Sequence, residues 1–206
     1  MITRIQAIEN LKKYIGDNLL KWAEFYGITV FKNGKQNKGW KGLVLERLAG
    51  LENDNKKAPN GLGFELKSVA FKKMQNGNIT PKETMAITMI NPQELLDTSD
   101  FYKSHLWEKL KSLVFCANLW LEENQEDSKL LAITSFDFLE NGNLIKEIEE
   151  DYNFIRKKMI EDGFENLTGK YGKWIQPRTK GAKNSTSRAF YARKDLVKII
   201  FNNINA

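Results

Sequence analysis

An acid and a lysine, Glu65 and Lys67, stand two residues apart in a segment that alternates between apolar and polar side chains. Residues i and i+2 of a β-strand point to the same face, so both groups would share one surface. A carboxylate beside a peptide carbonyl can bind a hard divalent cation, and a neighbouring ammonium can orient a water that attacks phosphorus. The spacing is therefore compatible with metal-assisted hydrolysis of a phosphate ester.

The triplet alone is weak evidence, because alternating charges on an exposed strand face produce it often. Two neighbours favour the chemical interpretation. Pro59 and Asn60 stand just before the strand, and Glu46 lies on the preceding predicted helix, where a second carboxylate could reach the same cation.

Basic side chains are concentrated at the C-terminal end of the sequence. The formal net charge is +6, but residues 166–206 hold nine Lys or Arg against one acid, and residues 1–165 are net negative. Such an asymmetry is typical of a surface that binds a polyanion, although a solvated basic tail would give the same count. Aromatic residues interleaved with the charges, such as Tyr171, Trp174 and Tyr191, favour a folded binding surface.

Composition limits the alternatives further. A chain of 206 residues with 41% apolar side chains can form one domain with a substantial core. One cysteine, Cys116, and one histidine, His105, exclude a disulfide framework and Cys- or His-rich metal centres. No apolar run approaches the roughly 18 residues of a membrane span, and the N-terminus lacks a signal-peptide core, so a cytoplasmic location is expected.

Periodicity and turn residues predict the elements that must position these groups. Helices are expected over 3–27, 40–48, 144–159 and from 195 onward, and strands around 64–69 and over 85–90, 113–120, 130–135 and 188–193. Segments 31–39, 51–61 and 177–186 are expected to be loops. The order predicts an α/β protein with a mixed β-sheet flanked by helices, in two lobes around a cleft.

Six blocks of the sequence, taken in order, resemble the MutH-like endonucleases, which comprise a mismatch-repair nicking enzyme and related type II restriction endonucleases of the PD-(D/E)xK superfamily. The blocks are KGWKGLVLE at 38–46, LGFELK at 62–67, PKET at 81–84, SHLWEKL at 104–110, QPRTKGA at 176–182 and AFYARK at 189–194. The resemblance implies a PD-(D/E)xK nuclease core that hydrolyses DNA with Mg²⁺.

The resemblance also assigns roles to particular residues. The catalytic set would be Glu46, Asn60, Glu65, Lys67 and Lys109, with Asn60 and Glu65 at the metal. DNA contacts would come from Lys38, Glu83, His105, Arg178, Lys180, Tyr191 and Arg193. For His105 the competing interpretation is helix capping or packing, and for Tyr191 it is packing within a sheet.

The sequence departs from the family pattern at Asn60, where the family has aspartate. An amide cannot supply the anionic oxygen that bridges substrate and cation. Either the chain is a catalytically disabled variant, which is the interpretation we favour, or another acid such as Asp54 takes over.

The connection between the two C-terminal blocks is also short, at residues 183–188, where the mismatch-repair enzyme carries a longer loop. This favours a sequence-specific type II restriction endonuclease. The alternatives are a strand-nicking enzyme activated by a mismatch-repair partner, and an inactive DNA-binding subunit of a heteromeric restriction enzyme. The expected partner is double-stranded DNA, bound by a homodimer or with a second nuclease subunit. A single endonuclease domain is expected over 1–206, with a catalytic lobe over about 1–110 and a DNA-recognition lobe over about 111–206.

Overall fold

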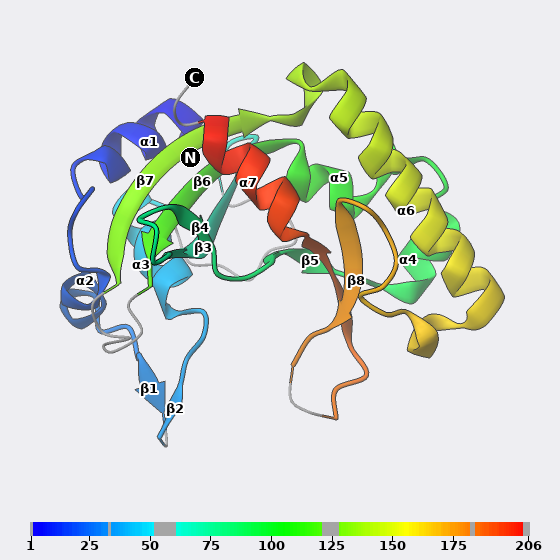
Figure 1. Cartoon of the computed structure of the whole chain (residues 1–206), viewed down its shortest axis with the longest axis horizontal. Coiled ribbons are helices and arrows are strands. Elements are labelled where there is room, and N and C mark those ends of the chain that lie inside the picture. Colours follow the sequence, from blue (N-terminus) through cyan, green and yellow to red (C-terminus); the bar gives the residue numbers. More distant parts are fainter. Residues whose placement is uncertain (1, 33, 52–60, 121–127, 182–183, 204–206) are drawn as a thin grey trace. The chain divides into compact units, whose positions relative to one another are not determined.

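The computed structural model describes residues 2–32, 34–51, 61–120, 128–181 and 184–203 (Figure 1). The chain divides into two compact units, each built from separate stretches of sequence. Unit 1 contains residues 1–83, 112–136 and 200–206, and unit 2 contains residues 84–111 and 137–199. The division therefore differs from the single boundary near residue 110 expected from the sequence.

Unit 1 is built on a four-stranded mixed sheet in the order β4-β3-β6-β7. Its strands are β3 (Glu65–Lys73), β4 (Ile79–Pro81), β6 (Ser112–Leu119) and β7 (Lys129–Asp137). β3 pairs in parallel with β6, Glu65 opposite Leu113, and antiparallel with β4, Phe71 opposite Pro81. This parallel pairing explains why unit 1 consists of separate stretches of sequence. Residues 84–111 belong to unit 2, and the next strand, β6, pairs again with β3 of unit 1.

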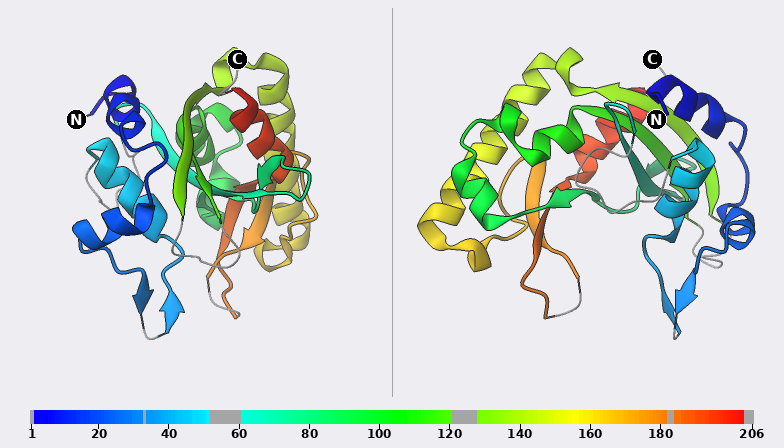
Figure 2. Two further views of the ribbon diagram at one scale, coloured as in Figure 1. Left: turned by 60° about the vertical axis from the view of Figure 1, so that its left-hand side comes forward. Right: turned by 180° about the vertical axis from the view of Figure 1, so that it is seen from behind.

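Three helices gather on one face of this sheet (Figure 2): α1 (Arg4–Lys12), α2 (Leu19–Phe25) and α3 (Trp40–Ala49). They bury a core in which Trp40 and Leu45 of α3 meet Phe64 and Leu66 beside and on β3, and Val114 on β6. A two-stranded hairpin, β1 (Phe31–Lys32) with β2 (Lys35–Gln36), precedes α3 where the sequence predicted a loop.

The prediction of one continuous helix over 3–27 is wrong, because the first helix ends at Lys12 and a second begins at Leu19. Gly16 has φ of 90°, a conformation outside the helical region, and its N–H donates to the carbonyl of Leu130 on β7. Asn18 then caps α2 by accepting from the N–H of Leu20. Pairing with β7 therefore overrides the apolar periodicity that suggested one helix.

Unit 2 contains a three-stranded antiparallel sheet in the order β5-β9-β8 and most of the remaining helices. Its strands are β5 (Met85–Met89), β8 (Ile175–Thr179) and β9 (Arg188–Ala192). The helical segments are α4 (Pro92–Asp97), η1 (Phe101–Lys103), α5 (His105–Leu110), η2 (Phe138–Glu140), α6 (Gly142–Asp162), η3 (Phe164–Asn166) and α7 (Lys194–Asn202), which continues into unit 1. The mixed sheet flanked by helices that the sequence predicted is confirmed.

A buried carboxylate ties the long helix α6 to the start of β8. Asp151, 7% exposed, accepts from the backbone N–H groups of Lys173, Trp174 and Ile175 at 2.6, 2.6 and 2.9 Å. A side chain at Gly172 would approach the carbonyl oxygen of Ile175 to 1.9 Å, so this turn requires glycine. We call these three residues with Asp151 and Gly172 the Asp151 clasp.

Two further observations concern the apolar residues. No helix in the described ranges is long and apolar enough to cross a bilayer. Cys116 is fully buried in β6, and its burial raises the thiol pKa to about 12, as expected for an unreactive core residue.

Candidate active site

Glu65 and Lys67 share one face of β3, as their spacing predicted. Lys67 Nζ donates to Glu65 Oε1 at 2.8 Å, and the Glu65 residue is only 5% exposed. A charged pair removed from water needs close hydrogen bonding to be tolerated, and this contact supplies part of it. The strand therefore holds a carboxylate and an ammonium together at a fixed position.

A pocket of about 390 Å³ opens beside this strand, entirely within unit 1. Its walls come from the start of α3, the first half of β3, the segment after β4 and the end of β6. Four of the side chains expected to function lie in it: Lys38, Glu46, Lys67 and Glu83. The structure thus brings Glu46 to the same pocket as Lys67 of the strand motif, although the two lie far apart in sequence.

The lining residues that were not predicted from the sequence include Lys41, Ser68, Lys82, Asn118 and Trp120. Lys41 and Lys82 had a weak signal, since each lies inside a block that resembles the family. Asn118 and Trp120 had none, because only the pairing of β6 with β3 brings them to the pocket.

Asn118 is a buried side chain that links β6, β3 and Lys41 by hydrogen bonds. It is 1% exposed, and its amide nitrogen donates to Ser68 Oγ at 2.9 Å and to the Val69 carbonyl at 3.1 Å. The amide oxygen is thereby left to accept from Lys41 Nζ at 3.5 Å. Lys82 Nζ lies 4.0 Å from the ring centre of Trp120, a close cation–π contact.

The ammonium of Lys41 is electrostatically unfavourable in this position. Burial lowers its pKa from 10.5 to about 8; the nearby carboxylate of Glu83 partly opposes the change, and the charge of Lys82 adds to it.

Carboxylates in and beside the pocket suit a hard cation, with Glu46 in its wall and Glu65 on the adjoining strand. Mg²⁺ is usually bound by one or two carboxylates while it keeps several waters, and Glu65 and Glu46 are carboxylates of this kind. Within the described ranges, no three Asp, Glu, His or Cys side chains come together as a metal site. Asn60 and Asp54, which the sequence analysis named for this role, lie outside the described residues.

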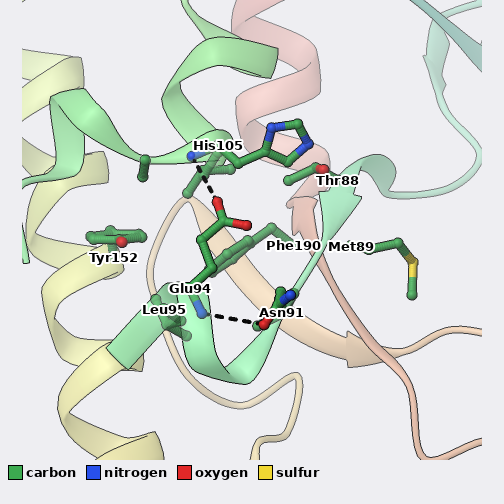
Figure 3. Close-up of a pocket in the computed structure, with 11 residues that line it drawn as sticks. Thr88, Met89, Asn91, Glu94, Leu95, His105, Tyr152 and Phe190 are labelled. Carbon is green, nitrogen blue, oxygen red and sulfur yellow. Dashed lines mark hydrogen bonds between the residues drawn. The ribbon is translucent and has the colours of Figure 1, made fainter. Parts of the chain in front are cut away.

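His105 and Lys109 belong to unit 2, on the short helix α5. Ser104 rather than His105 caps this helix, since its hydroxyl accepts from the N–H of Trp107 at 3.1 Å. His105 lines a pocket of only about 20 Å³, where its backbone N–H donates to Glu94 Oε1 at 3.3 Å (Figure 3). Lys109 is 8% exposed. This pocket is large enough for about one ordered water.

Arg178 lies on strand β8 and not in the loop predicted over 177–186. It is exposed, its Nη1 donates to Thr84 Oγ1 at 3.1 Å, and its guanidinium lies 5.7 Å from the ring centre of Tyr191 on the paired strand β9. Lys180 follows directly after β8 and is also exposed. The sheet therefore presents Arg178 and Tyr191 together on one surface.

Arg193 has structural contacts in the same unit. Its Nε donates to the Gly172 carbonyl at 2.9 Å, and its Nη2 donates to the carbonyls of Gly169 and Tyr171 at 2.8 and 3.1 Å. These bonds hold the segment that leads into the Asp151 clasp.

Comparison with known proteins finds similarity to a family model and to individual relatives. The family model described as DNA mismatch repair enzyme MutH matches residues 49–147, a range that includes Glu65 and Lys67 but not Glu46 or Arg178. The type II restriction enzyme Sau3AI of Staphylococcus aureus is 24% identical over 187 residues, which are 89% of this chain and 37% of that protein. The mismatch repair protein MutH of Escherichia coli is 25% identical over 186 residues, 87% of this chain and 77% of that protein.

A solved complex of the restriction endonuclease MvaI with its cognate DNA covers 97% of each chain, at 14% identity and a TM-score of 0.42. Two kinds of protein therefore match the sequence, a type II restriction enzyme and the mismatch repair enzyme MutH. The chain is similar to both at 24–25% identity over most of its length, and the MutH family model matches just under half of it. It spans little more than a third of the length of the Staphylococcus enzyme.

Proposed function

We propose that this protein is a sequence-specific type II restriction endonuclease that hydrolyses phosphodiester bonds of double-stranded DNA with Mg²⁺. The observation that carries the proposal is the contact of Lys67 with Glu65 beside the pocket that Lys67 shares with Glu46. A bound Mg²⁺ supplies Lewis-acid stabilisation of the charge that develops on the phosphate.

Glu65, Glu46 and Lys67 have roles that their positions support. Glu65 holds the cation, with Glu46 assisting from α3. Lys67, whose ammonium Glu65 fixes in place, orients the attacking water. Lys109 stabilises negative charge near the reacting phosphate, a role that rests on the family resemblance alone.

DNA recognition is proposed for the β8–β9 sheet and the basic C-terminal segment. Arginine and lysine side chains on a strand can reach base edges in the major groove, and arginine paired with guanine is the commonest specific contact. Exposed Arg178 and Lys180 meet this requirement, and Lys38 and Glu83 border the catalytic pocket.

The chain with Asn60 is proposed to be catalytically disabled, because the position lacks the anionic oxygen of aspartate. An amide ligand binds a cation more weakly and leaves less stabilisation for the transition state. The protein is therefore expected to bind specific DNA but to cleave it very slowly.

A second candidate, a strand-nicking enzyme activated by a partner protein, is favoured by the match to MutH over 77% of that protein's length. Digestion of a supercoiled plasmid by the Asn60→Asp protein in Mg²⁺ distinguishes the two. A restriction enzyme yields linear DNA with defined ends without a partner, whereas a nicking enzyme yields open circles.

The same digestion tests the assignment of Asn60. Cleavage is expected to rise at least about a hundredfold on Asn60→Asp, the effect of restoring one strong transition-state contact. Unchanged cleavage would contradict the alignment of Asn60 with the aspartate of the family and would favour an inactive DNA-binding subunit.

A further inference from the structure

The pocket beside β3 contains two lysines that the proposed hydrolysis does not use. Lys41 and Lys82 line it together with Asn118 and Trp120, at some distance in sequence from the Glu65 and Lys67 pair. Their contacts are specific, since Asn118 holds the Lys41 ammonium and Trp120 underlies that of Lys82. Both cations are therefore positioned at the pocket wall.

The two neighbouring ammonium groups repel one another, so the arrangement is electrostatically unfavourable when the pocket holds no anion. Two ammonium groups close enough to affect one another face the same pocket, with the carboxylate of Glu83 as the opposing charge beside Lys41. Bringing like charges together and partly out of water is unfavourable unless an anion binds between them. On an ordinary solvated surface, by contrast, the lysine side chains would extend into water and keep their charges apart.

The start of α3 also suits an anion. Helix α3 begins at this pocket through Gly39, Trp40, Lys41 and Gly42, and its N-terminus has no side-chain cap. The N–H groups of Gly39 and Trp40 already donate to Asn37, so the helix contributes mainly through its dipole, which favours negative charge at the N-terminus and adds to the effect of the lysines. The volume of about 390 Å³ also exceeds by far the roughly 10–15 Å³ that one ordered water needs.

We infer that Lys41 and Lys82, with the start of α3, form a phosphate-binding subsite that takes a DNA backbone phosphate other than the one that is hydrolysed. The inference rests on the proposed function, since it assigns a second phosphate of the same DNA to the same pocket. Lys38, at the border of the pocket, belongs to the DNA contacts already proposed. The subsite would fix the register of the strand relative to Glu65 and Lys67.

The test neutralises one charge on each partner. DNA duplexes that each carry one methylphosphonate, a phosphate without its negative charge, are titrated against the parent protein, Lys41→Met and Lys82→Met. Methionine retains most of the apolar stem, so the fold is kept, and a urea titration of each variant checks this. Lys12→Met, at the exposed end of α1 and outside the pocket, serves as the matched control.

The parent and the control should lose roughly tenfold in affinity when one particular phosphate away from the cleavage point is neutralised. In Lys41→Met and Lys82→Met this loss should disappear, and the dependence of affinity on salt should fall by about one in slope. If each variant and each methylphosphonate instead weaken binding additively at every position, the subsite is refuted.

Cleavage of unmodified DNA by the Asn60→Asp protein separates this inference from the proposed function. We call the disappearance of the methylphosphonate effect in the two variants coupling. Cleavage without coupling at any phosphate overturns the subsite and leaves the proposed nuclease function standing. Coupling without cleavage keeps the subsite and overturns the nuclease. If neither is found, both are overturned.

Discussion

The contact of Lys67 with Glu65 gives a residue-scale prediction that separates positioning from binding. In the Asn60→Asp background, Lys67→Ala is expected to abolish cleavage while changing DNA affinity by less than about tenfold, because a water-orienting ammonium contributes mainly in the transition state. Cleavage rates and equilibrium binding measured on the same duplex check it. Lys73→Ala, at the exposed end of the same strand, is the control and should leave both quantities unchanged. Should affinity fall in proportion to cleavage, Lys67 is a phosphate contact only.

Lys41 makes a prediction about stability as a function of pH. Its folded pKa of about 8 lies below the unfolded value of 10.5, so the unfolded state binds more protons between these values. The protonated side chain therefore destabilises the fold fully below pH 8, and the effect is relieved as pH rises towards 10.5. Lys41→Met should raise the free energy of unfolding at pH 7 by about 1 kcal/mol, a figure well under the full shift because solvent screens the group.

Urea unfolding of the parent and of Lys41→Met at pH 7 and pH 9.5 measures this effect. The stabilisation is expected to shrink at the higher pH. An equal gain at both pH values would show that it comes from packing of the methionine and not from charge.

At the scale of elements, the β8–β9 pair gives a prediction about specificity. Arg178 stands exposed on β8, and its guanidinium lies close to the ring of Tyr191 on β9. Arg178→Ala should weaken binding to the cognate duplex by roughly 1–3 kcal/mol and affect random DNA little. Lys198→Ala, on α7 where the lysine pairs with Asp195, should leave the discrimination intact.

Competition binding at two salt concentrations measures both variants. Equal weakening on cognate and random DNA would make Arg178 a phosphate contact. The loss of discrimination in Lys180→Ala, directly after the same strand, would support base reading by this segment as a whole.

The Asp151 clasp predicts that one carboxylate holds the recognition sheet on α6. Asp151→Ala would leave three backbone N–H groups, one buried and two part-buried, without their acceptor and should lower the free energy of unfolding by about 3 kcal/mol. Glu150→Ala, the exposed neighbour on the same helix, should change it by less than about 0.5 kcal/mol. Urea denaturation of the three proteins makes the comparison, and equal stabilities would contradict a structural role for the clasp.

At the scale of the whole molecule, local patterns predicted what depends on local residues. The two-residue alternation placed Glu65 and Lys67 on one face, and the apolar spacing over 144–159 located α6, which runs from Gly142 to Asp162. Local patterns gave the wrong secondary structure where pairing with a strand distant in sequence determines it. Pairing with β7 divides the first helix, and pairing with β9 draws Pro177 and Arg178 into a strand. The pocket residues Asn118 and Trp120 could not be predicted, because their role arises from the sheet and not from their neighbours.

The parallel pairing of β3 with β6 has a consequence for synthesis of the protein. The helices α1, α2 and α3 leave the ribosome before β6, yet they share a core with Val114 and Cys116 of that strand. Residues 84–111, which belong to unit 2, are made in between, so the closure of this core depends on a contact of large sequence separation and is slow. A nascent chain that has not reached residue 119 therefore exposes the apolar faces of its first helices and the unpaired edge of β3, the features that chaperones bind and that promote aggregation.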